Sequence, residues 1–132
     1  MLAPSALVVV ADGSSAHLYK NIGHETISLE LLETITPHSL THDEGLAGHS
    51  LVEQTPQDRG ESGFIGQLVH KLNALALAHA LPSEVVIVAD PTSLGHMRPL
   101  YHAELKKRIV RELHKTMVKA SAHDLALALS KA

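Results

Sequence analysis

The sequence predicts an α/β fold with a mixed β-sheet, and two short apolar runs are the main reason. Both runs are uninterrupted and rich in β-branched residues, which is typical of strands buried on both faces: Leu7-Val8-Val9-Val10 and Val85-Val86-Ile87-Val88. Each run continues into Ala-Asp and then a turn-forming residue. An amphipathic helix is predicted between them, so we expect both strands at the centre of the sheet. In such sheets, ligands usually bind beyond the carboxyl ends of the central strands.

The composition sets limits on the class of protein. A chain of 132 residues predicts a single domain, residues 1–132, that is large enough to bury a real core. Aromatic residues make up only 2%, so the core is aliphatic. The low aromatic content also argues against base-stacking nucleic-acid modules, which need Phe, Tyr or Trp platforms. The chain has no cysteine, which excludes disulfides, thiolate catalysis and cysteine zinc sites. The first apolar run is too short for a secretory signal or a membrane span, so we expect a cytoplasmic protein.

The first third of the chain predicts a three-stranded antiparallel meander. Residues 6–11 form the first strand, and the Asp12-Gly13 turn leads into a second strand over residues 16–20. Residues 26–34 form the third, with Ile27, Leu29 and Leu31 on one face. Residues 36–62 are rich in Gly, Pro and polar residues and show little periodicity. They predict a long loop, which in a compact domain is more often functional or disordered than inert.

The remaining elements are predicted by spacing and by capping residues. Ser62 is the expected N-cap of a helix that ends near residue 80, and residues 84–89 form the central strand. Pro91 ends that strand, and a short helix follows from about Ser93. Periodicity leaves residues 98–117 open: a four-residue spacing favours one helix, and the alternation of Ile109, Arg111 and Leu113 fits a strand. A last helix follows Ser121.

Charge is distributed unevenly along the chain. Residues 1–97 carry three basic residues against eleven acidic ones, and residues 98–132 carry eight basic against three acidic, a net +5. The basic segment centres on Lys106, Lys107, Arg108, Arg111, Lys115 and Lys119. Such a segment either meets phosphate or an acidic partner, or is a solvated face that balances the acidic half.

Two aspartates are the first candidates for catalysis. If the two buried strands are parallel neighbours, Asp12 and Asp90 lie at the same edge of the sheet. A carboxylate pair of this kind holds Mg²⁺ or Mn²⁺ for phosphodiester hydrolysis, with Glu61 as the third carboxylate available. The alternative, which we favour, is structural: Asp12 shapes a turn and Asp90 caps a helix. No cofactor is expected on this interpretation.

Binding and metal candidates follow the same logic. His96 and Arg98 come after the carboxyl end of the central strand, where Arg98 either holds phosphate or carboxylate, or pairs with Asp90 or Asp12. The loop over residues 36–62 has metal-ligand residue types in His38, His42 and His49, without a recognised ligand spacing. No nucleophile motif or phosphate-binding glycine loop occurs.

Several segments resemble one family. Val8-Val9-Val10-Ala11-Asp12-Gly13-Ser14-Ser15-Ala16 resembles the opening of the bacterial host attachment proteins, and residues 85–100, with Leu94-Gly95-His96-Met97-Arg98, resemble their central segment. Residues 110–115 and 121–129 resemble the closing strand and helix. That family is similar in fold to the middle domain of archaeo-eukaryotic release factors and Pelota. The resemblance implies a ribonuclease H-like five-stranded sheet of order 3-2-1-4-5 with three helices, in which residues 109–115 form strand 5 beside strand 4.

One departure limits what the resemblance implies. Release factors carry Gly-Gly-Gln before the first helix, and the matching segment here is Asp58-Arg59-Gly60-Glu61-Ser62-Gly63. We therefore expect a binding module without enzymatic activity, which contacts RNA or the translation machinery. The residues expected to bind are Arg59, His96, Arg98, Lys106, Lys107, Arg108 and Arg111. Two alternatives stay open: a metal-dependent nuclease or hydrolase that uses Asp12 and Asp90, and a protein–protein adaptor in attachment or stress physiology that dimerises through an exposed edge strand.

Overall fold

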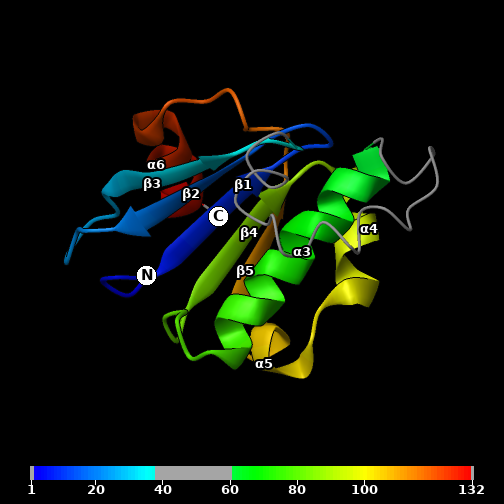
Figure 1. Cartoon of the computed structure of the whole chain (residues 1–132). Helices are drawn as coiled ribbons and strands as arrows, with labels where there is room; N and C mark the ends of the chain where they lie inside the picture. Colours follow the sequence, from blue (N-terminus) through cyan, green and yellow to red (C-terminus); the bar gives the residue numbers. More distant parts are fainter. Residues whose placement is uncertain (1, 38–60, 132) are drawn as a thin grey trace.

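The protein forms one five-stranded mixed sheet in the order β3-β2-β1-β4-β5, which confirms the predicted order (Figure 1). The structure is a computed structural model, and it describes residues 2–37 and 61–131. The strands are β1 (Leu7–Ala11), β2 (Ala16–Asn21), β3 (Leu29–Ile35), β4 (Val85–Ala89) and β5 (Ile109–His114). β1 pairs antiparallel with β2 and parallel with β4, and β5 is parallel to β4. β5 is thus a strand, which settles the interpretation that periodicity left open.

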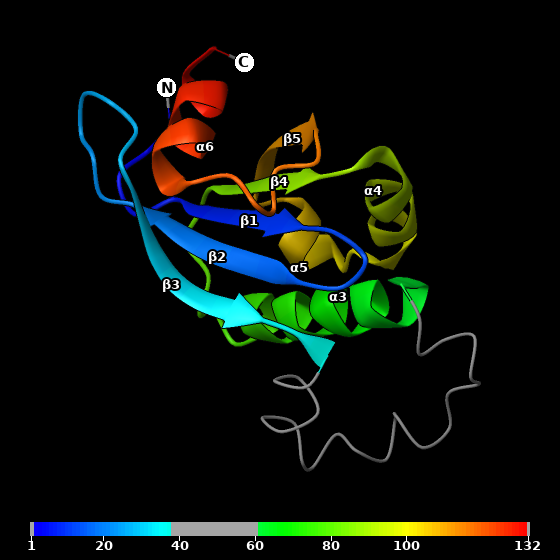
Figure 2. The same cartoon turned by 90° about the horizontal axis from the view of Figure 1, so that it is seen from above.

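Helices cover both faces of this sheet. α3 (Glu61–Leu77), α4 (Pro91–Met97), the 3₁₀ turn η2 (Arg98–Leu100) and α5 (Ala103–Lys106) lie on one face. α6 (Ala122–Lys131) lies on the other, as Figure 2 shows from above. The three predicted helices correspond to α3, α4 and α6. α5 was not predicted, because a helix of four residues is too short to show a period.

The core has two layers that share the central strands. Val9, Ile87 and their neighbours at every second position face α3, where Leu68 and Leu72 pack on them. The intervening residues, such as Val8 and Val86, face α6 and pack with Leu125 and Leu129. Every residue of β1 and β4 is buried. The interpretation of the two apolar runs as strands buried on both faces is therefore confirmed.

The ends of α3 differ from the prediction. The helix begins at Glu61, so Ser62 lies inside it and is not its N-cap. It ends at Leu77 and not near residue 80, because His79 has a left-handed backbone with φ of 57°. The His79 N–H donates to the Ala76 carbonyl at 3.1 Å, and the Ala80 N–H donates to the Leu75 carbonyl at 2.8 Å. These two bonds form a Schellman motif with histidine where glycine is usual.

Each edge strand contains one residue that its neighbour does not pair with. In β3 the pairing with β2 skips Leu32, and in β5 the pairing with β4 skips Val110. A regular alternation would place Ile109, Arg111 and Leu113 on one face. Because of the bulge, Ile109 packs on the α3 side and Leu113 on the α6 side. The strand that the alternation favoured is therefore present, but its apolar residues Ile109 and Leu113 lie on opposite faces of the sheet.

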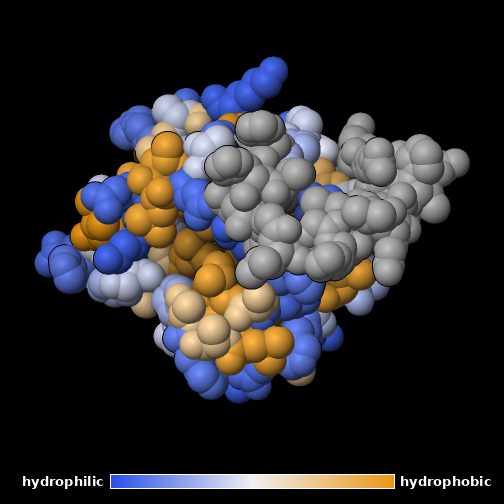
Figure 3. Space-filling view, viewed as in Figure 1, coloured by the Kyte–Doolittle hydropathy of each residue, from blue (hydrophilic) through white to orange (hydrophobic). Residues whose placement is uncertain are grey.

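Apolar surface remains exposed beside the core. Leu31 and Leu32 of β3 and Leu77 of α3 are each about half exposed. Figure 3 shows apolar surface over the β3 side of the molecule and near the lower end of α3. Within residues 2–37 and 61–131, no helix has both the length and the apolar character needed to cross a membrane.

Candidate functional site

The two predicted aspartates lie at the same edge of the sheet. Ala11 of β1 is paired with Ala89 of β4 in parallel register, so Asp12 and Asp90 leave adjacent strands side by side. The sequence predicted this juxtaposition. What each carboxylate does at this edge is decided by its hydrogen bonds.

Asp12 organises the turn between β1 and β2. One of its oxygens, Oδ1, accepts hydrogen bonds from the backbone N–H groups of Ser14 and Ser15, both at 2.8 Å. Partial burial raises the pKa of Asp12, but the hydrogen bonds from Ser14 and Ser15 outweigh it, and the pKa is lowered overall. Asp12 is therefore an ionised turn residue at neutral pH.

Asp90 is the N-cap of α4. Its Oδ2 accepts a hydrogen bond from the Ser93 backbone N–H at 3.1 Å, and Pro91 follows in the first turn. Its other oxygen, Oδ1, is buried and has no hydrogen-bond partner in the described part of the chain. Both aspartates thus have the structural roles that were the alternative to catalysis.

The side chains of the remaining catalytic and metal candidates, and of the binding candidate Arg59, lie outside the part of the chain that the structure describes. Arg59, His38, His42 and His49 lie outside the described residues, and so does the side chain of Glu61. Among the residues described, no group of three His, Asp or Glu side chains is placed to hold a metal ion.

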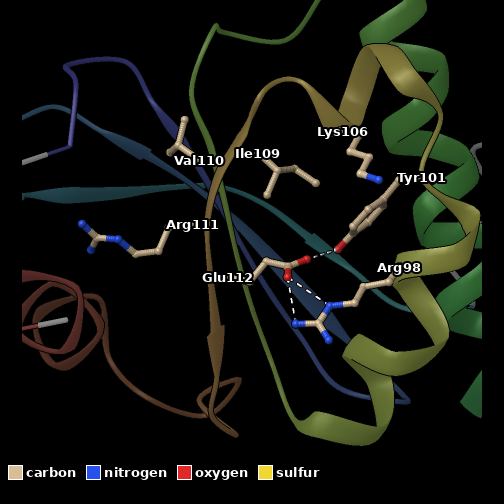
Figure 4. A pocket seen from close by; sticks show the side chains of 7 residues that line it. All are labelled: Arg98, Tyr101, Lys106, Ile109, Val110, Arg111 and Glu112. Atoms are coloured by element: carbon tan, nitrogen blue, oxygen red, sulfur yellow. Dashed lines mark hydrogen bonds and ion pairs between the residues drawn. The ribbon is translucent and has the colours of Figure 1, made fainter.

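A groove runs along β5 at the edge of the sheet (Figure 4). It has a volume of about 420 Å³. Residues 109–112 of β5 line one wall, and Arg98, Tyr101 and Lys106 line the other. We call this the β5 groove. Arg98, Lys106 and Arg111, three of the seven residues predicted to bind, are among its lining residues.

A hydrogen-bond network centred on Glu112 fixes the far end of the β5 groove. Glu112 Oε1 accepts from Arg98 Nε at 3.0 Å and is 2.9 Å from Arg98 Nη2. Glu112 Oε2 accepts from the Tyr101 hydroxyl at 3.1 Å, and Arg98 Nη2 also lies 2.9 Å from His114 Nε2. Arg98 therefore pairs with Glu112, and not with Asp90 or Asp12 as one alternative held.

Tyr101 is a hydrogen-bond donor locked in its protonated form. Burial raises its pKa, and the neighbouring Glu112 carboxylate raises it further, because a phenolate beside a carboxylate would be repelled. The ring packs against the core on one side and lines the β5 groove on the other.

The remaining basic candidates differ in how far they are engaged. Lys107 and Arg108 both pair with Glu104, at 3.0 and 3.4 Å. Arg111 donates to the Leu129 carbonyl at 2.8 Å, and Figure 4 shows its side chain directed away from Arg98 and Lys106. Lys106 is exposed and forms no ion pair with any described residue. His96 is exposed on α4.

Three residues of this site were missed by sequence analysis. Tyr101 and Glu112 lie eleven positions apart, on different elements, and only the tertiary fold brings them into contact. Asn73 of α3 holds the segment around Tyr101, accepting from the His102 N–H at 2.9 Å and donating to the Leu100 carbonyl at 3.0 Å. An asparagine on a helix face carries no signal for such a contact, whereas a tyrosine three residues after Arg98 could have been noted.

Comparison with known proteins places the chain in a family. A family model described as bacterial archaeo-eukaryotic release factor family 12 matches residues 5–129. No curated protein matches the chain. The match supports the release-factor side of the resemblance and gives no support to the host attachment name. On this match, and with the predicted sheet order observed, the chain belongs to the bacterial archaeo-eukaryotic release factor family 12.

Proposed function

We propose that this protein is an RNA-binding module of the translation machinery that lacks release-factor catalysis. The observation that carries the proposal is the β5 groove, where Arg98 and Lys106 from separate segments lie on one wall. Residues 98–115, which form this side of the molecule, have six basic residues against two acidic ones, a net +4. A local excess of positive charge attracts the phosphate backbone of RNA.

The chemistry of release is not part of the proposal. Peptide release in the related factors depends on a Gly-Gly-Gln motif, and this sequence contains none. The one Gly-Gln pair, Gly66-Gln67, lies within α3. Family membership therefore supports contact with RNA. It does not support hydrolysis of peptidyl-tRNA, because the motif on which that reaction depends is missing.

The proposal is tested by binding of the full chain to a short unstructured RNA and to ribosomes at several salt concentrations. The double variant Lys106→Gln, Lys115→Gln removes two exposed charges beside β5. We expect it to weaken binding about tenfold or more and to reduce the salt slope by about two. The control variant Lys20→Gln, Lys131→Gln removes the same charge elsewhere and should leave binding nearly unchanged. Equal losses in both variants, or no binding at low salt, would contradict the proposal.

Metal-dependent RNA cleavage is the second candidate. It is favoured by the adjacent positions of Asp12 and Asp90 and by the unpartnered Oδ1 of Asp90. It is weakened because the other oxygen of Asp90, and Oδ1 of Asp12, already bind backbone N–H groups. The test is cleavage of RNA with Mn²⁺ by the native chain and by Asp90→Asn, which keeps the helix cap. Cleavage that is lost in the variant supports the nuclease; an inactive native chain rules it out.

A further inference from the structure

The β5 groove combines an apolar wall with positive charge at its rim. Ile109 and the Tyr101 ring form the apolar part, and Val110, which is 54% exposed, lies at the edge. Lys106 and Arg98 provide the charge. Figure 4 shows the Lys106 side chain beside the Tyr101 ring, and the Arg98 guanidinium on the other side of Tyr101, directed at Glu112. The volume of about 420 Å³ falls in the range of small-ligand pockets, roughly 300–1,000 Å³.

The one carboxylate in the β5 groove is already used. Both oxygens of Glu112 have partners, Arg98 on one and Tyr101 on the other. The same bonds hold the Arg98 guanidinium by its Nε and Nη2 atoms, with the side chain still 49% exposed. Nη2 also contacts His114 Nε2, so the N–H groups of Nη1 are the ones that this guanidinium keeps available to a second anion. Lys106, which is exposed and has no described ion-pair partner, adds a second positive charge.

We propose that the β5 groove binds one nucleotide unit of single-stranded RNA. The phosphate lies against Lys106, where Arg98 adds to the local positive charge, and the base lies against Tyr101 and Ile109. This inference rests on the proposed function and specifies the form of RNA that the site accepts. A base inside a duplex is stacked and cannot enter the groove, whereas a single-stranded base is free to turn out.

The chemistry of the lining limits the site to one unit. Tyr101 is the only aromatic ring among the described residues that line the β5 groove, so a run of stacked bases has no platform beyond the first. An extended peptide that pairs with β5 is the competing occupant. The bulge at Val110 opposes it, because a bulge breaks the regular ladder that an added strand needs.

The test is titration of the ¹⁵N-labelled full chain with adenosine monophosphate, followed by NMR. We expect amide shifts at residues 109–112, and about tenfold weaker binding of adenosine or inorganic phosphate alone, since each meets only half of the site. Lys106→Gln should weaken the nucleotide about fivefold, as for the loss of one charged contact. The matched control Lys107→Gln, next along the chain and paired with Glu104, should change it less than twofold.

Competition separates the failure of this inference from that of the proposed function. An unstructured RNA that binds and displaces the nucleotide, when a duplex of the same sequence does not, supports the inference. RNA that binds without moving the amides of residues 109–112 overturns the groove site and leaves the proposed function standing. If the nucleotide binds but the RNA does not, both the proposed function and the inference about the β5 groove are overturned. An acidic peptide that moves the same amides in place of the nucleotide overturns the inference in favour of strand addition.

Discussion

The Tyr101 hydroxyl is a single group whose environment has a measurable consequence. It donates to Glu112 from a half-buried position, and its pKa is raised by burial and by that carboxylate. The folded state therefore keeps the phenol proton at a pH where the unfolded chain, with an ordinary tyrosine pKa of about 10, loses it. It follows that the contribution of Tyr101 to stability is complete below pH 10 and declines as the pH rises above that value.

Tyr101→Phe should accordingly cost stability at neutral pH and cost less under alkaline conditions. Loss of a hydrogen bond to a charged acceptor predicts about 1.5 kcal/mol at pH 7. Above about pH 10 the difference between native and variant proteins should shrink. Urea unfolding of both proteins at each pH measures this difference. A difference that grows with pH would show that the pKa of Tyr101 is lowered and not raised.

Single residues also show where sequence analysis reached its limit at the site. Arg98 was predicted to bind because it follows a central strand, and it lines the β5 groove. One of the two alternatives for Arg98 paired it with Asp90 or Asp12, which leave the central strands at the same edge of the sheet. The partner is Glu112, and the reason is the side of the sheet that Glu112 faces, which depends on the bulge at Val110. No local pattern specifies which strand position is skipped.

The end of α3 is a local motif with a suboptimal residue. His79 occupies the left-handed position of the Schellman motif, where a side chain with Cβ is strained by about 1 kcal/mol or more. Glycine adopts this conformation without that cost.

His79→Gly should therefore raise the free energy of unfolding by about 0.5–1 kcal/mol. The matched control is Ala80→Gly, one residue on, where φ is not in the left-handed region; it should give no gain. Thermal and urea unfolding compare the two variants with the native protein. A destabilised His79→Gly would indicate that the imidazole itself contributes at this position.

The sequence predicts an element well when burial of the whole element determines its pattern. It predicts an element poorly when a single residue, such as a bulge or a cap, determines where the element lies. β1 and β4 can be recognised in the sequence because strands buried on both faces need unbroken apolar runs. β5, half-buried and bulged, has no such run, and only the family resemblance identified it. α5 begins at an N-cap provided by His102, whose Nδ1 accepts from the Glu104 N–H at 3.0 Å. Histidine is not a usual capping residue, so this start carries no signal.

The two core layers belong to one cooperative structure because β1 and β4 supply side chains to both. A loss of packing on one face must loosen strands that the other face also uses. The α6 layer is the smaller of the two, and Leu125 and Leu129 are the large α6 side chains that pack on the sheet there.

Leu125→Ala on the α6 side and Leu68→Ala on the α3 side should each lower the free energy of unfolding. In both variants the whole molecule should still unfold in a single transition. Each leucine is fully buried, which predicts a loss of about 2–5 kcal/mol in either case. Far-ultraviolet circular dichroism and tyrosine fluorescence, measured on the same samples, should give coincident curves. Separate transitions in Leu125→Ala would show that the α6 layer melts on its own.

The bulges at Leu32 and Val110 have a consequence for solubility. Neither residue is paired with a residue of the neighbouring strand. If either is deleted, every paired residue still points to the same face of the sheet, so the core is unchanged. What such a deletion creates is a straight, regular edge that another copy can extend. A loss of one residue here would yield a protein that folds normally, keeps its heat stability and precipitates from concentrated solution. We therefore expect the bulges at Leu32 and Val110 to act against edge-to-edge association of copies of this chain.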